Sequence, residues 1–523
     1  MRLAVALVLV VLLTTGAALG ASESGAGLPA NGVAGEDAPV ELAGLTLFVR
    51  EFLFEGNTIV SDEELRELLA PMVGRRLTLN ELHLASAAVA LYYRALGYFA
   101  ADAILPPQEI VDDAVTIRVF EGRYDQLVID NRSSLRDSVV RSIFHWFKTD
   151  SLIESSPYER ATLLLAEIPG IEATAYLAPG SREGTADLVI LLQDGKQAAG
   201  QLALERRSFA SGAARLTTSF SPTLDNPLGR GDQISMSVSV GGTSSGSHVQ
   251  QGRVEYTLPV GAGGKVGFGY SGALQSIPDA LEVLDISVWS HSTSLSAAYA
   301  AVLTQQSSLS VGARLERTGA GRSINGYETS EGQRTRLSAG IEGQRRWDFA
   351  GGVGMNEFAV NTTLAARSSG GAELFHKMNG TFTQRRWWAG GVEVVGSLRL
   401  QWAFTNLESG EKMELRPSGH RVGVSGDLGW TGQIEVRKAW PRLGTLPGRW
   451  EGFLRLDAGG VQRERFPAGE AVAIERRYGV GAGLTWGLPG GSLLALEFGL
   501  PLSIDEESSE RAGELALRYA FSF

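Results

Sequence analysis

From Gln197 onward, apolar and polar residues alternate strictly in short segments that glycine pairs separate. In the segment 233–240, Ile, Met and Val share one face of a strand, and Gln and Ser share the other. The segments 397–404 and 433–437 alternate in the same way. Because side chains repeat every two residues on a strand and every 3.6 residues on a helix, this pattern predicts an all-β region with few helices.

A soluble β-sandwich also alternates, but two features favour a transmembrane β-barrel. One face of many segments is polar or small, as a water-filled lumen requires, while the other face is uniformly apolar or aromatic. The last strand carries Tyr519, Phe521 and Phe523 on one face, and it resembles the C-terminal signal by which outer-membrane barrels are recognised for assembly. At about 20 residues per tilted strand with its turn, residues 197–523 predict about 16 antiparallel strands.

Residues 47–195 differ from the barrel region because helix and strand signals alternate there. They contain two copies of one small α+β unit, which we expect at 47–122 and 123–195. In the first copy, capping boxes predict helices after Ser61 and Thr78. In the second copy, Ser156 is expected to be an N-cap, followed by a proline at the first helical position.

The N-terminus has the features of an export signal. A basic start precedes an apolar run over residues 3–13, and the small residues Ala18 and Gly20 fit a cleavage site. The run is shorter than the roughly 20 residues that a transmembrane helix needs. We expect residues 1–20 to be a signal peptide and residues 21–46 to be a short Gly/Ala-rich segment, which shows no clear amphipathic helix.

Composition argues against several classes of function. The 523 residues include no Cys, which excludes a disulfide framework, a thiolate metal site and a catalytic Cys. The net charge of −11 argues against nucleic acid as a partner, and the six His are scattered along the chain. The glycines at 479, 481 and 483 resemble part of a dinucleotide-binding loop, but no helix signal follows them. We therefore expect no enzyme, no cofactor and no metal.

The order and spacing of several motifs resemble the transporter component of two-partner secretion systems. This family of haemolysin and adhesin secretion-and-activation proteins belongs to a superfamily of outer-membrane barrels preceded by periplasmic POTRA domains. The resemblance covers about residues 47–523. Its motifs include Phe54-Glu55-Gly56-Asn57-Thr58, Val119-Phe120-Glu121-Gly122-Arg123, Ile168-Pro169-Gly170-Ile171 and Asn226-Pro227-Leu228-Gly229-Arg230-Gly231-Asp232.

The resemblance also implies a site inside the barrel. The superfamily folds a long loop with a Val-Arg-Gly-Tyr-type tip into the lumen, and Arg416 stands at that tip, followed by Pro-Ser in place of Gly-Tyr. A Phe-x-Asp-x-Gly motif on the wall normally faces this Arg. Here Arg455 replaces the Phe, while Asp457 and Gly459 are kept. The resemblance therefore implies that Arg416 pairs with Asp457.

The residues alone leave another arrangement open, in which Asp457 pairs with Arg455 or other lumen residues and Arg416 lines an external loop. A further barrel motif, which contains Asp427 and Gly429, follows the loop tip.

The resemblance implies protein export through the outer membrane of a Gram-negative bacterium. POTRA domains in the periplasm would capture an unfolded adhesin- or haemolysin-like partner by β-augmentation, and the partner would pass through the lumen without nucleotide hydrolysis. Outer-membrane lipid and, during biogenesis, the barrel assembly machinery are the other expected partners. The alternatives are an assembly or insertion factor of the same superfamily, and a plain diffusion porin that would leave the POTRA-like units unexplained.

Overall fold

The structure, a computed structural model, describes residues 46–209, 214–244, 246–278, 284–367, 373–420, 423–442, 444, 446–464, 474–488, 490–502 and 513–523. The expected signal peptide and nearly all of the segment after it lie outside the described residues. In these described ranges, no helix is long and apolar enough to cross a membrane.

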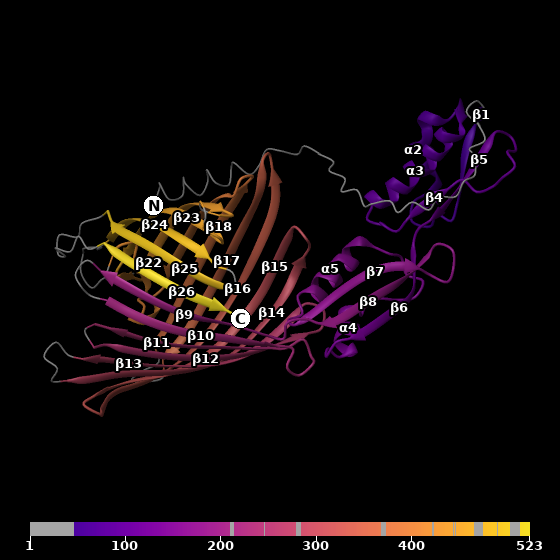
Figure 1. Ribbon diagram of the computed structural model, residues 1–523. Helices are drawn as coiled ribbons and strands as arrows, with labels where there is room; N and C mark the ends of the chain where they lie inside the picture. Colours follow the sequence, from indigo (N-terminus) through magenta and orange to yellow (C-terminus); the bar gives the residue numbers. More distant parts are fainter. Residues whose placement is uncertain are drawn as a thin grey trace.

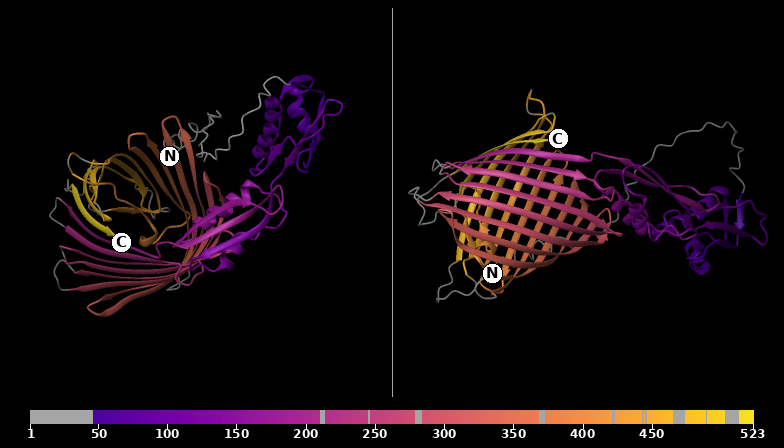
Figure 2. Two further views of the ribbon diagram at one scale, coloured as in Figure 1. Left: turned by 45° about the vertical axis from the view of Figure 1, so that its right-hand side comes forward. Right: turned by 90° about the horizontal axis from the view of Figure 1, so that it is seen from below.

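A closed barrel of 16 antiparallel strands follows two α+β units, and this confirms the predicted fold class (Figures 1 and 2). The last strand, β26, pairs with the first, β9, and so closes the sheet. The strands are β9 (Ala198–Phe209), β10 (Ala214–Asp225), β11 (Gln233–Thr243), β12 (His248–Val260), β13 (Gly264–Pro278), β14 (Asp285–Leu303), β15 (Ser307–Ile324), β16 (Tyr327–Phe349), β17 (Gly352–Arg367), β18 (Glu373–Trp388), β19 (Val392–Ala403), β22 (Leu428–Trp440), β23 (Arg449–Gln462), β24 (Ile474–Gly487), β25 (Ser492–Pro501) and β26 (Glu514–Ser522).

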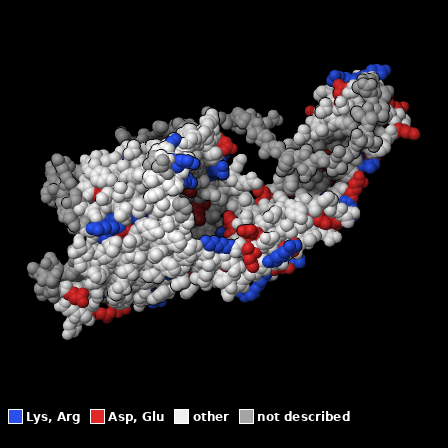
Figure 3. Space-filling model, in the orientation of Figure 1, with Lys and Arg blue, Asp and Glu red and all other residues white. Residues whose placement is uncertain are grey.

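The outward face of the barrel is a broad apolar band. Met236 and Val238 of β11 and Phe268 of β13 are each about half exposed. The space-filling view shows a largely uncharged outer surface over the barrel strands, whereas acidic and basic side chains gather on the α+β units (Figure 3). An exposed apolar surface of this extent is typical of strands that face lipid.

The C-terminal residue completes the closing seam between β26 and β9. The Phe523 amide donates to the Gly200 carbonyl at 3.0 Å, and the Gly200 amide donates to the Phe523 carbonyl at 3.1 Å. The Phe523 ring stacks on Phe220 of β10 with 6.1 Å between centroids. A Cβ at position 200 would lie 2.4 Å from the ring, so glycine is what allows the aromatic residue to approach.

The first α+β unit has a core between two helices and two small sheets. Strand order is β2-β5-β4 in one sheet, and β1 pairs with β3 in the other. Side-chain and backbone bonds at Ser61 and Thr78 form the two predicted capping boxes. The elements are β1 (Thr46–Val49), β2 (Glu51–Glu55), α2 (Asp62–Leu69), η1 (Ala70–Met72), β3 (Arg75–Thr78), α3 (Leu79–Ala95), β4 (Asp102–Ile104) and β5 (Ala114–Phe120).

The second α+β unit is a three-stranded sheet of order β6-β8-β7 covered by two helices. The expected N-cap at Ser156 is wrong, because the helix begins at Ser155 and Glu154 occupies the cap position without a side-chain hydrogen bond. The elements are β6 (Arg123–Arg132), α4 (Asp137–Ile143), α5 (Ser155–Ala166), β7 (Ile171–Pro179) and β8 (Thr185–Asp194).

Glu121 joins two motifs that lie far apart in the sequence of the first unit. Its buried carboxylate accepts hydrogen bonds from the Thr58 amide, the Thr58 hydroxyl at 2.5 Å and the Ile59 amide at 2.7 Å. Burial by itself raises the pKa of Glu121, but these hydrogen bonds and the charge of Arg123 outweigh it and lower the pKa below its ordinary value. Glu121 therefore stabilises the unit in its charged form.

The second unit docks on short turns at one end of the barrel (Figure 1). The Arg136 amide donates to the Gly229 carbonyl at 2.9 Å in the turn between β10 and β11. Arg160 of α5 donates to the Ala262 carbonyl at 3.3 Å in the turn between β12 and β13. Because the α+β units precede the barrel at this end, we call it the periplasmic end.

We predict that Phe523→Ser lowers the amount of inserted barrel several-fold, because the closing seam loses its terminal ring. The measurement is the heat-modifiable band of the chain in outer-membrane fractions. Phe268→Ser, which removes a similarly exposed lipid-facing ring far from the seam, is the matched control. Equal losses in both variants would contradict a special role for the terminal residue.

We predict that Glu121→Gln destabilises the first unit by about 1–3 kcal/mol at pH 7, because buried donors lose their charged acceptor. The pKa of Glu121 is lowered on folding, so its contribution is complete above the ordinary glutamate pKa and falls as the pH drops through the lowered value. The unaltered chain should therefore lose stability in the first unit below about pH 4.5, and the variant should lose less.

Hydrogen exchange of residues 51–60 in the full chain, corrected for the intrinsic pH dependence of exchange, measures both effects. The matched control is Glu55→Gln, which removes an exposed carboxylate from a surface pair with Arg118. If this control changes protection as much as Glu121→Gln does, the buried hydrogen bonds are not the cause.

Candidate functional site: a loop folded into the barrel

The described residues between β19 and β22, 404–420 and 423–427, fold into the lumen, as the resemblance implied; we call them the in-folded loop. It contains η2 (Ser409–Glu411), β20 (Met413–Leu415) and β21 (Val424–Gly426), and β20 pairs with β21. These short strands contact β22 and β23 of the wall. Leu415 is almost fully buried, and a Cβ at Gly459 of β23 would overlap its side chain. The loop therefore lies directly on the inner wall.

The base of the in-folded loop is held by a buried charge cluster that the sequence analysis missed. Glu411 is only 3% exposed and forms ion pairs with Arg334 at 2.8 Å, with Lys377 at 2.9 Å and with Arg336. Arg334 also pairs with Glu408. A carboxylate this deep needs several cations around it to offset its desolvation. The sequence signal was an Arg-x-Arg pair on one face of β16, which alternation assigns to the lumen.

Asp427 ties the end of the in-folded loop back to its start. Its carboxylate is buried, lies 3.3 Å from the Lys412 ammonium and accepts the Leu407 amide at 3.2 Å. Gly429 follows on β22, where a Cβ would lie 2.8 Å from the Val461 side chain. The two residues of the predicted barrel motif thus lie at the neck of the loop.

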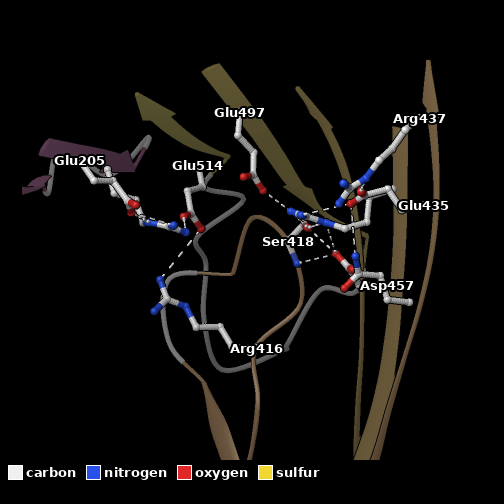
Figure 4. A network of polar contacts seen from close by, with 11 residues as sticks. Glu205, Arg416, Ser418, Glu435, Arg437, Asp457, Glu497 and Glu514 are labelled. Carbon is white, nitrogen blue, oxygen red and sulfur yellow. Dashed lines mark hydrogen bonds and ion pairs between the residues drawn. The ribbon is translucent and has the colours of Figure 1, made fainter. Parts of the chain in front are cut away.

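At the tip, the expected pair of Arg416 with Asp457 is wrong. Asp457 instead accepts the Ser418 amide at 3.1 Å and the Ser418 hydroxyl, and it lies 3.5 Å from Arg455 (Figure 4). Both residues are described, and they form no ion pair with each other. The physical reason is a turn that begins at Pro417, whose carbonyl accepts the His420 amide at 3.2 Å. This turn directs the backbone of Ser418, rather than the Arg416 side chain, toward β23.

Arg416 extends toward the closing seam of the barrel instead. Its guanidinium lies 4.0 Å from the Glu514 carboxylate on β26, and its Cζ lies 5.7 Å from the centre of the Phe209 ring on β9. Glu514 also pairs with Arg207 of β9. Phe209 and Glu514 are register partners across the seam. The tip therefore contacts both strands that close the barrel.

The two departures from the superfamily pattern contact each other. Arg455, which stands where Phe is usual, donates to the hydroxyl of Ser418, which stands in the altered tip, at 2.8 and 3.1 Å. Arg455 also pairs with Glu497 and lies 3.8 Å from Glu435. The carboxylates of Asp457, Glu497 and Glu435 thus compensate the charge of Arg455, and the Ser418 hydroxyl is a further acceptor for it.

Glycines on the inner wall make room for the tip. A Cβ at Gly479 would lie 2.5 Å from the Ser418 carbonyl oxygen, and one at Gly499 would lie 2.6 Å from the Gly419 amide. Gly479 belongs to the run that resembled part of a dinucleotide-binding loop, and it is a strand residue of β24. A glycine repeat with a period of two on the lumen face is the sequence signal for such a docking surface.

The contacts of this site are mostly charged pairs and hydrogen bonds. Among the described residues, no cluster of three or more His, Asp or Glu side chains could hold a metal ion. What the site can do is hold a loop in the lumen through contacts at its base, neck and tip. The contacts of the tip are polar and can be replaced by water.

Comparisons with known proteins agree with this architecture. Residues 47–122 match the ShlB-type POTRA domain, and residues 184–486 match the haemolysin secretion/activation protein ShlB/FhaC/HecB. The heme/hemopexin transporter protein HuxB of Haemophilus influenzae (strain 86-028NP) is 26% identical over 209 residues. That match covers 40% of this chain and 36% of HuxB.

Two solved structures share the fold across nearly the whole chain. CdiB from Acinetobacter baumannii matches with a TM-score of 0.68 and 15% identity, covering 98% of this chain and 96% of that one. CdiB from Escherichia coli matches with a TM-score of 0.70 and 19% identity, covering 94% and 93%. Because the family model spans more than half of the residues, this chain belongs to the ShlB/FhaC/HecB family of haemolysin secretion/activation proteins, POTRA-bearing β-barrels of the outer membrane.

Proposed function

We propose that this chain carries an exported partner protein, adhesin- or haemolysin-like, across the outer membrane through its barrel. The observation that supports this most directly is the combination of a closed barrel with two α+β units at its periplasmic end. The lumen of the barrel holds the in-folded loop, which polar contacts attach to the wall. Passive diffusion through a porin does not require those units. Family membership favours secretion over the assembly of other barrels.

The periplasmic units would capture the partner while it is unfolded. In the second unit, β7 is an edge strand of nine residues that pairs with β8 among the described strands. An edge of this kind offers main-chain donors and acceptors to any extended segment, with little demand on sequence. Outer-membrane lipid would surround the apolar band, and the assembly machinery would recognise the strand that ends in Tyr519, Phe521 and Phe523.

The in-folded loop would act as a gate. Its tip is held by the contacts of Ser418 with Asp457 and Arg455, and by the pair of Arg416 with Glu514. Each of these hydrogen bonds involves a charged partner and contributes about 1.5–3 kcal/mol net, because water replaces the partner when the bond breaks. An entering polypeptide can therefore displace the tip without an external energy source, and folding outside the cell would favour outward transport.

Removing residues 47–195 should leave a folded barrel in the outer membrane and reduce release of the partner at least about tenfold, because capture is lost. The partner is identified first as the exported protein that disappears from the culture medium when the whole chain is deleted. Normal release by the shortened chain would contradict capture by the α+β units. A drop in other outer-membrane barrels with an unchanged medium would instead favour the assembly or insertion alternative.

Ser418→Ala should raise the frequency of channel openings several-fold in planar lipid bilayers, because the tip loses its hydroxyl contacts with Asp457 and Arg455. Asp457→Asn should act in the same direction, and the double variant should add little, because both changes break one contact. Ser425→Ala, an exposed serine of β21 in the same loop, is the matched control. Unchanged openings in both test variants, or fully additive effects, would reject the tip contact as the gate.

A further inference from the structure

One side of the lumen is lined by serine hydroxyls. Ser237 and Ser239 alternate on β11 with Val238 and Val240, which are about half exposed on the lipid face, so the serines face inward. Serines also line β10, β13 and β14, because Ser219 is the register partner of Ser239 and Ser271 is the register partner of Ser292. Between them, β12 contributes Gln251 and Arg253 instead of serine. We call this surface, on β10–β14, the serine wall.

The serine wall borders open space. A cavity of about 290 Å³ lies against it, lined by Ser219, Ser237, Ser239, Ser271 and Ser290 together with Gln251 and Arg253. The bonds that anchor the in-folded loop go to β16 and β18 at its base and to β23 and β26 at its tip. Figure 2 (left) shows orange segments inside the barrel beside the yellow strands.

Hydroxyls suit a surface along which a polypeptide moves. Each serine can donate one hydrogen bond and accept others, so it can satisfy either a backbone N–H or a backbone C=O. The charges that β12 adds to this wall, Arg253 and Glu255, pair with each other at 2.5 Å, so they attract charged segments of a passing chain less than unpaired charges would. The opposite wall carries the denser Arg and Glu cluster of the loop site. Conduction requires binding that is favourable enough for entry and weak enough for exit.

The docking of the second α+β unit leads to the same wall. Its contacts reach the β10–β11 turn at Gly229 and the β12–β13 turn at Ala262. A third contact joins the Glu159 carboxylate to the Gln305 amide, in the turn between β14 and β15, at 2.7 Å. All three turns connect strands that carry or border the serine wall. A segment released from this unit therefore enters the lumen beside the serines.

We propose that the serine wall is the track that an extended polypeptide follows through the lumen. The proposal rests on the proposed export function and adds which face of the barrel the partner contacts. It predicts that a chain in transit lies within reach of β11 and β14 and away from the lumen face of β18. The loop site then determines when the lumen is open, and the serine wall determines where the partner passes.

The chain has no Cys, so single cysteines report contacts without background. The test variants are Ser237→Cys on β11 and Ser292→Cys on β14. The matched controls are Thr381→Cys and Thr383→Cys, which alternation places on the lumen face of β18. The probe is the exported protein identified from the medium, with cysteines in its N-terminal part and a folded domain at its C-terminus that stalls it in the barrel.

We expect disulfide-linked complexes with the stalled protein at least about fivefold more often from the serine-wall positions than from β18. Equal yields on the two walls, or higher yields from β18, would overturn the proposal. Heat-modifiable barrel must be present in every variant, and labelling with a small thiol reagent shows that each cysteine is accessible. If the Cys-free parent releases no protein, the proposed export function is wrong, and the proposed track is then wrong as well.

A second measurement does not depend on cross-linking. Ser237→Arg with Ser292→Arg should reduce release of the partner several-fold, because two long cations obstruct the track. Thr381→Arg with Thr383→Arg should leave release within twofold of the parent. Normal release by the first pair, or equal loss from both pairs, would contradict the serine wall as the path while leaving the export function intact.

Discussion

Every backbone N–H and C=O in the lipid region must be hydrogen-bonded within the protein, and this requirement governs the rest of the structure. A sheet satisfies it only if its first and last strands pair, as β9 and β26 do. Closure creates the lumen and assigns alternate residues to water or lipid. It also gives Phe523 its place, because the terminal amide and carbonyl complete the ladder with Gly200.

Closure also explains why the in-folded loop is built from polar contacts. An apolar tip packed in the lumen would be a permanent core, whereas a tip held by hydrogen bonds and a partly exposed ion pair can leave the wall at modest cost. The buried charges of Glu411 and Asp427 hold the base and neck of the loop more firmly. The tip contacts the wall through Ser418 and the closing seam through Arg416. The loop thus contacts β26 and β9, which form the seam, and it also contacts β23.

The lumen has two chemically different sides. The charged side, on β16–β26, carries the loop and its counter-charges, with Glu411 and Asp427 buried at the base and neck. The hydroxyl side, on β10–β14, borders open space and lies above the docked α+β unit. This division places the proposed gate and the proposed path on different strands, so each can be altered without the other.

The sequence by itself determined the fold class, because a period of two sustained from Gln197 to Phe523 is compatible only with strands that separate two environments. The capping boxes at Ser61 and Thr78 could also be predicted from the sequence, since a capping box lies within four consecutive residues. The partner of Arg416 was not, because it depends on how a long loop turns at Pro417 inside the lumen. The cation cluster on Glu411 likewise combines residues from three distant segments. Only the closed barrel brings these side chains together, and its geometry decided which charges meet.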